Sequence, residues 1–94
     1  MKAIHKHPLV CPGRTSVMMP AGVEILSVQM QPSQGVMVWY QFTTGAAGAA
    51  GAPGVQKHFV AVGTGQEFHL MAARYLATVQ EGGLVWHIFE DLGE

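Results

Sequence analysis

The chain contains 94 residues, of which 49% are hydrophobic and 12% are charged, and its formal net charge at pH 7 is −1. This length suits one domain, residues 1–94, with a modest core, and the five Lys and Arg residues are too few to neutralise several phosphates, so direct nucleic acid binding is not expected. Cys11 is the only cysteine, which excludes an intrachain disulfide, and no apolar run approaches the roughly 18 residues of a membrane helix.

Three extended segments, separated by Pro and Gly, are predicted in the first part of the chain. Polar and apolar side chains alternate in them, most clearly in the third, and this alternation is typical of strands. Pro8 suits an edge or an end of a strand, and Pro20 and Gly22 end the second segment. The four residues 32–35 have the length of a hairpin connection to the next strand. The segments are residues 3–10, 15–19 and 23–31.

The strongest predicted strand, residues 36–44, concentrates β-branched and aromatic side chains around Trp39 and Tyr40. We expect it at the centre of a sheet. The next stretch, 45–54, contains only Gly, Ala and Pro and is predicted to be a long, flexible hairpin loop. A short helix through its alanines is the alternative, although each helical Gly costs about 1 kcal/mol. Residues 55–62 are expected to return as the partner of the central strand.

The last third of the chain predicts a closing hairpin. Two strand-like runs, 72–80 and 83–90, meet across a Glu-Gly-Gly turn. Before them, the glycines of 63–65 end a strand, and 66–73 has no decisive periodicity, so a helical turn and an irregular crossover stay open. Residues 91–94 are predicted to be a frayed acidic tail.

Six or seven short strands at this spacing predict an all-β fold. The expected architecture is a compact antiparallel sandwich or a partly open barrel.

Several motifs of the chain, in their order and spacing, resemble a family of small phage and prophage proteins known only as a domain of unknown function. The resemblance covers nearly the whole chain, from a Lys-rich start with Pro8-Leu9 to the last strand. The motifs are Met19-Pro-Ala-Gly-Val-Glu-Ile-Leu-Ser-Val-Gln29, Phe59-Val-Ala-Val-Gly-Thr-Gly65, Tyr75-Leu-Ala-Thr-Val-Gln80 and Leu84-Val-Trp-His-Ile-Phe-Glu90.

The chain departs from that family in two places. It has the Gly/Ala stretch 45–54 where relatives carry a short polar loop, and it has Gln66 where many place a histidine after Gly-Thr-Gly. The resemblance implies a bacteriophage accessory protein made in the cytoplasm of the infected bacterium. The amino end also lacks the apolar segment of a signal peptide, which agrees with a cytoplasmic location.

Five histidines, His5, His7, His58, His69 and His87, are the candidate metal ligands. On one strand, the side chains of His5 and His7 would lie about 7 Å apart on the same face, where a third ligand from a neighbouring strand could complete a metal site. Neither Cys nor carboxylate flanks the pair at ligand spacing. We therefore expect packing and surface histidines, with no metal and no cofactor.

Catalytic signatures are weak. His87 could act as a general base oriented by Glu67 or Glu90, but the sequence reveals no nucleophile for it. Gly63-Thr-Gly65 lacks the third glycine and the helix of a dinucleotide-binding loop. Cys11 has no nearby base or cation that would favour a reactive thiolate. The sequence therefore predicts a protein that is not an enzyme.

Binding of another protein is the function that we expect. Trp39 and Tyr40 are consecutive on one strand and face opposite sides, so a second copy or a partner protein would cover one of them. Six methionines suit an adaptable surface as well as a core.

The first hypothesis is an inhibitor of a bacterial host protein or of an antiviral defence component, similar in role to an anti-CRISPR protein. The alternatives are a structural or assembly protein of the virion and, less favoured, a small His-based metal protein or enzyme. In the first hypothesis an edge strand and the Gly/Ala loop contact the target, and deleting residues 46–53 weakens binding but not stability. The expected contact residues are Trp39, Tyr40, Phe59, Ala46 and Ala49.

Overall fold

The computed structural model describes residues 1–44 and 54–93, which form seven strands and no helix. No segment of the described residues is therefore a helix that could cross a membrane. The strands are β1 (Lys2–Pro8), β2 (Gly13–Pro20), β3 (Glu24–Gln31), β4 (Gly35–Thr43), β5 (Gly54–Gly63), β6 (Ala72–Glu81) and β7 (Leu84–Gly93).

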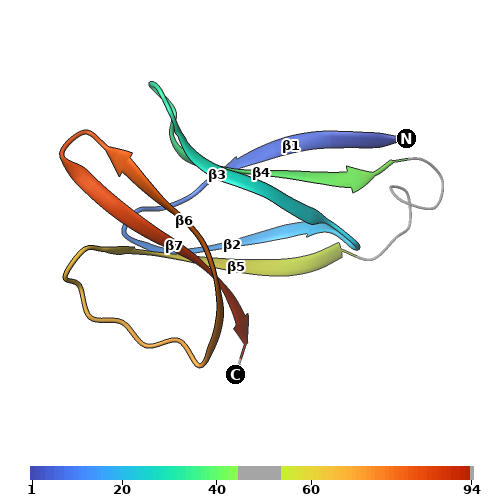
Figure 1. Ribbon diagram of the computed structural model, residues 1–94. Coiled ribbons are helices and arrows are strands. Elements are labelled where there is room, and N and C mark those ends of the chain that lie inside the picture. Colours follow the sequence, from blue (N-terminus) through green and yellow to red (C-terminus); the bar gives the residue numbers. More distant parts are fainter. Residues whose placement is uncertain (45–53, 94) are drawn as a thin grey trace.

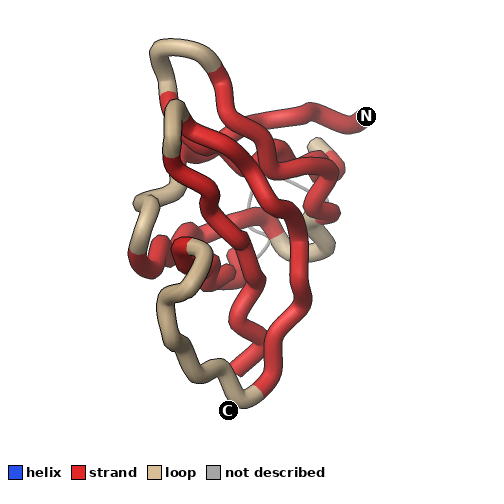
Figure 2. The backbone as a smooth tube through the Cα atoms, turned by 60° about the vertical axis from the view of Figure 1, so that its left-hand side comes forward, coloured by secondary structure: helices blue, strands red, loops and turns tan. Residues whose placement is uncertain are grey.

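The strands form two antiparallel sheets that do not close into a barrel. One sheet has three strands in the order β1-β4-β3, and the other has four in the order β2-β5-β7-β6 (Figure 1). The predicted all-β fold, a compact antiparallel sandwich or a partly open barrel, is thus confirmed as two antiparallel sheets. A second view shows how the long β6–β7 hairpin runs along the molecule, beside the longest described loop (Figure 2).

The core lies between the two sheets and is built by alternation along each strand. In β4, Val36, Val38 and Tyr40 point inward, and in β7, Trp86 and Ile88 do the same. Burial of these apolar side chains stabilises the fold by roughly 25 cal/mol per Å² removed from water. The four largest fully buried side chains are Met19, Val38, Phe59 and Ile88.

Two predicted hairpins and the central strand are confirmed. Strand β4 has β1 on one edge and β3 on the other, and residues 32–34 form the turn between β3 and β4. The chain then ends on the β6–β7 hairpin, with Gly82 and Gly83 in its turn.

The predicted pairing of residues 55–62 with the central strand is wrong. Strand β5 lies in the other sheet, between β2 and β7. The reason is that β1 and β3 occupy both hydrogen-bonding edges of β4 and leave no edge for β5. Strands β4 and β5 therefore do not form a hairpin, and the loop predicted between them falls mostly on residues 45–53, which lie outside the described residues.

The predicted frayed tail is also wrong for the residues described. Strand β7 continues to Gly93, and Asp91 pairs with His58 of β5 on one side and Ala73 of β6 on the other. Asp91 is paired on both sides, and Gly93 after it remains paired with β6, which holds this segment in the sheet. Residues 66–71, which the sequence left open, form an irregular loop with no helical turn.

Candidate functional site

The outward face of the four-stranded sheet contains a group of partly exposed aromatic side chains with defined mutual contacts. Because side chains alternate along β7, Trp86, Ile88 and Glu90 are buried, whereas His87 and Phe89 point outward and are only partly covered. The sequence correctly predicted that His87 faces away from Trp86. Phe89 was missed, although the same alternation places it beside His87.

Three aromatic rings form what we call the aromatic surface: Phe68, Tyr75 and Phe89. The ring centroids of Phe68 and Phe89 are 5.1 Å apart, and those of Tyr75 and Phe89 are 5.7 Å apart in an edge-to-face arrangement. These are favourable geometries for aromatic pairs. Phe68 nevertheless remains 50% exposed and Tyr75 56% exposed, so the cluster offers a large apolar area to solvent or to a partner.

A chain of polar contacts borders the aromatic surface. Thr64 Oγ1 lies 2.7 Å from His87 Nε2, and Thr78 Oγ1 lies 3.1 Å from His87 Nδ1. The same Thr78 oxygen lies 2.6 Å from the hydroxyl of Tyr75. Both ring nitrogens of His87 are thus engaged by hydroxyl groups, and the chain holds the rings of His87 and Tyr75 in place. Glu90 does not orient His87, because its side chain points to the opposite side of the sheet.

Phe68 lies in the loop of residues 64–71, and Gln66 forms hydrogen bonds that fix the beginning of this loop. The Gln66 side-chain oxygen accepts a hydrogen bond from the Gly63 N–H at 2.9 Å, and the Gln66 N–H donates to the Gly63 oxygen at 3.0 Å. This pair of bonds fixes the first turn of the loop. The residue at which the chain departs from the resembling family therefore has a structural contact of its own.

A row of polar residues crosses the same sheet beside the aromatic surface. Ser16 Oγ on β2 lies 2.7 Å from His58 Nδ1 on β5. Asp91 on β7 accepts hydrogen bonds from Arg14 and from the Gly93 N–H. Those bonds, with that from Gly93 as the larger cause, lower the pKa of Asp91. Among the described residues no hydrogen bond joins His58 to Asp91, so the row is not a connected nucleophile, base and acid.

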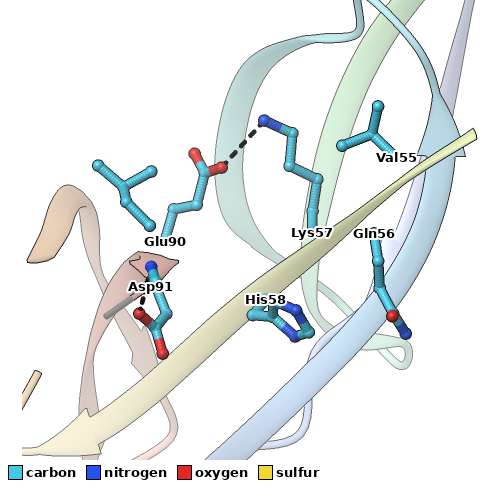
Figure 3. A pocket seen from close by; sticks show the side chains of 8 residues that line it. Val55, Gln56, Lys57, His58, Glu90 and Asp91 are labelled. Carbon is cyan, nitrogen blue, oxygen red and sulfur yellow. Dashed lines mark hydrogen bonds and ion pairs between the residues drawn. The ribbon is translucent and has the colours of Figure 1, made fainter.

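A pocket of about 220 Å³ opens where β5 and β7 separate (Figure 3). Pairing between the two strands ends at His58 and Asp91, after which β5 stays with β2 and β7 stays with β6. The pocket is lined by Val55, Gln56, Lys57, His58, Glu90, Asp91, Leu92 and Gly93.

An ion pair occupies the inner side of this pocket. Glu90 is only 3% exposed, and its Oε2 lies 3.1 Å from Lys57 Nζ (Figure 3). A buried carboxylate of this kind needs a charged or hydrogen-bonding partner. The carboxylates of Glu90 and Asp91 thus each have a cationic partner within the protein, and His58 is hydrogen-bonded to Ser16.

The outward face of the three-stranded sheet has a second hollow, of about 280 Å³. It is formed by Trp39 together with side chains from β1 and β3. Ile4 is 59% exposed and Leu26 is 43% exposed at its border. The lining residues are Ile4, Leu26, Ser27, Gln29 and Trp39.

The structure separates the residues that the sequence grouped as contact residues. Trp39 lies on the outward face, as one of the two consecutive aromatic residues must. Tyr40 and Phe59 belong to the core and are 8% and 1% exposed, because each alternates with outward neighbours on its strand. They cannot contact a partner in this fold. Ala46 and Ala49 lie outside the described residues.

The candidate metal ligands do not converge. His5 packs edge-to-face on Tyr40 and Phe42 at the inner side of β1, whereas His58 and His87 point outward from the other sheet. Among residues 1–44 and 54–93, no three His, Cys, Asp or Glu side chains are close enough to bind one metal ion. Burial, followed by the negative charge of Glu81, raises the pKa of the Cys11 thiol to about 11, so the thiolate is disfavoured.

Comparison with known proteins identified one family. The family model described as "Domain of unknown function (DUF7352)" matches residues 1–94. Neither the comparison with curated proteins nor the comparison with solved structures found a match.

Proposed function

The chain belongs to the DUF7352 family, and we propose that it is a bacteriophage accessory protein that binds a protein of the bacterial host in the cytoplasm. The binding site in this proposal is the aromatic surface of Phe68, Tyr75 and Phe89. The partner is a host protein whose activity the phage needs to block, such as a component of antiviral defence. The protein needs no cofactor and catalyses no reaction in this role.

The observation that supports this proposal is the exposure of the aromatic surface. Phe68 and Tyr75, whose rings lie 5.1 and 5.7 Å from that of the half-buried Phe89, remain exposed to solvent, although their burial would be favourable. Tyr and Phe are enriched at the centres of protein interfaces, where a few such side chains provide most of the binding energy. The hydrogen bond between the Tyr75 hydroxyl and Thr78, which also contacts His87, reduces the freedom of Tyr75 before binding, and this lowers the entropic cost of association.

The charge distribution also suits a protein partner. Charged residues make up only 12% of the chain, and apolar and aromatic groups are the ones enriched at interface centres. Arg14 and Asp91 lie on the same face and neutralise each other. The face therefore has no strong field of one sign that would attract nucleic acid or an anionic membrane.

A capture experiment with matched variants tests this proposal. The tagged full-length protein is incubated with lysate of the bacterial host, and a partner recovered in stoichiometric amount is then purified and titrated against the protein. We expect Phe68→Ser and Tyr75→Ser each to weaken that binding by tenfold or more, since truncating an interface anchor costs about 2 kcal/mol.

The control is Leu84→Ser, because Leu84 is similarly exposed, at 55%, but lies in the turn region of the β6–β7 hairpin. Binding should be unchanged in this variant, and all three variants should melt near the wild-type temperature. Equal affinity of the wild type and the two aromatic variants would refute the assigned surface. Recovery of phage structural proteins alone would instead support a role in the virion.

A further inference from the structure

The outward face of the three-stranded sheet presents apolar side chains that the described residues cover only in part: Ile4 and Leu26 are exposed, and Trp39 is half-buried. Trp39 lies at its centre, with Ile4 on one side and Leu26 on the other, around the hollow of about 280 Å³. Next to Trp39 along β4, Met37 is only 5% exposed. The Lys6 side chain, which reaches from β1 to Gln31 on β3, crosses the sheet above it. Polar side chains thus cover Met37, whereas the hollow beside Trp39 remains open.

The charges on this face are divided between its two edge strands. Lys2 and Lys6 alternate with inward residues on β1, so both point outward. Glu24 points outward on β3, in the same row of the sheet as Ile4. Lys6 and Glu24 bond to the neutral amides of Gln31 and Gln41, respectively. One edge of the face is therefore positive and the opposite edge is negative.

We propose that a second copy of the chain covers this face, related to the first by a two-fold axis that runs along β4. Such an axis lies in the interface and places β1 of each copy over β3 of the other. Glu24 of the second copy then lies opposite Ile4, and Lys2 and Lys6 flank it at about 7 Å on either side along the strand. The contact is made twice, because the interface is the same from both copies.

The apolar side chains match in the same arrangement. Leu26 is the extra residue of the bulge between Ile25 and Ser27, so it lies between the rows of Tyr40 and Trp39. In the dimer it lies over β1 of the other copy between Ile4 and Lys6, where it packs beside the Ile4 side chain. Trp39, which lies on β4, meets its own equivalent near the axis. The hollow around Trp39 is filled from both sides.

Charge selects this axis over the other two-fold arrangement in which the strands of the two sheets are aligned. A two-fold axis across the strands would place β1 over β1 and thus lysines over lysines. Like charges brought together in an interface cost several kcal/mol. Only the axis along β4 brings the positive edge over the negative edge.

The dimension of the face predicts a modest affinity. Three strands of about eight residues span roughly 27 by 14 Å, or about 760 Å² for the two faces together, which is below the roughly 1,200 Å² in total of specific, stable interfaces. We expect a dimer that dissociates on dilution. This inference concerns a different sheet from the aromatic surface, so it stands independently of the proposed function.

Analytical ultracentrifugation of the full-length protein over a wide concentration range tests the proposal. The wild type should be a dimer at high concentration. Glu24→Lys and the double variant Lys2→Glu/Lys6→Glu should each be monomers, because each makes both edges of the face carry the same sign. An equimolar mixture of the two variants should recover a dimer, since the charges are complementary again. The control Glu67→Lys changes the net charge by the same amount as Glu24→Lys, but on a distant loop. It should dimerise like the wild type.

Three outcomes would overturn the proposal: a wild type that is monomeric at every concentration, dimers of Glu24→Lys that are as stable as those of the wild type, or no recovery in the mixture. Circular dichroism of each variant confirms that it is folded. A monomeric Glu24→Lys that still captures the host partner would show that the two surfaces act separately.

Discussion

At the scale of single residues, neighbours in the chain have opposite environments. Trp39 points outward and Tyr40 inward, and the same holds for Asp91 and Glu90. As a result the carboxylate of Glu90 is buried. Its charge is compensated by Lys57, whose side chain is 27% exposed. If a buried carboxylate loses its cationic partner, the free-energy cost of its desolvation is no longer compensated, and the folded state is destabilised.

Replacing Lys57 therefore tests how strongly the fold depends on this ion pair. We expect Lys57→Met to lower the free energy of unfolding by about 2–3 kcal/mol, somewhat less than for a fully buried pair because Lys57 is partly exposed. Urea denaturation measures the change. The double variant Lys57→Met/Glu90→Leu should recover most of the lost stability, because no unpaired charge remains. A single variant as stable as the wild type would show that water or another group satisfies Glu90.

At the scale of elements, the closing hairpin depends on both its turn and its strands. Gly82 has a φ of 61°, which lies in the left-handed region, whereas the neighbouring Gly83 has a negative φ. Beside the turn, Trp86 Nε1 donates a hydrogen bond of 2.9 Å to Glu81 Oε1. The turn thus needs one glycine for its backbone conformation, and not two.

The two glycines provide a matched pair of variants. A Cβ added at either position meets no atom within 4 Å, so any difference between them comes from the backbone. We expect Gly82→Ala to destabilise the protein by about 1–2 kcal/mol, the cost of a left-handed conformation for a residue with a Cβ. Gly83→Ala should be neutral or slightly stabilising. Thermal unfolding of both variants checks this, and equal melting temperatures would show that the turn adjusts its conformation.

At the scale of the whole molecule, side-chain contacts join strands that are distant in the sequence. Arg14 on β2 pairs with Asp91 on β7 across the intervening β5, and residues 14 and 91 are near opposite ends of the chain. The lowered pKa of Asp91 means that the folded state binds its proton less readily than the unfolded chain does. This contribution to stability is present above the ordinary pKa of Asp, about 3.9, and is lost as the pH falls through the lowered value.

Acid denaturation of Asp91→Asn tests this link. The variant should be less stable than the wild type at neutral pH, and the difference should disappear as the pH falls below about 4. Stability is measured by urea denaturation at each pH. For Arg14→Gln the difference in stability from the wild type should also decrease as the pH falls. This decrease should be smaller, because the hydrogen bond from Gly93 to Asp91 remains. A difference that is constant with pH would show that the carboxylate charge is not responsible.

Local patterns in the sequence were sufficient to predict many of the strands of the fold. Alternation along residues 23–31 and 83–90 predicted strands, and Pro and Gly marked their ends. The same alternation correctly placed His87 outside when Trp86 was assigned to the core. These predictions succeeded because they depend on φ and ψ preferences and on the two-residue period of a strand, both of which are local.

By itself, then, the sequence determined an all-β chain, the approximate bounds of its strands and the two hairpins. Only the tertiary structure decided that β5 pairs with β2 and β7 rather than with β4, that Phe59 is buried, and that Phe68, Tyr75 and Phe89 meet on one face. The reason is physical: pairing between distant strands is chosen by which edges remain free and which side chains fill the shared core, and neither is encoded in the alternation of a single strand.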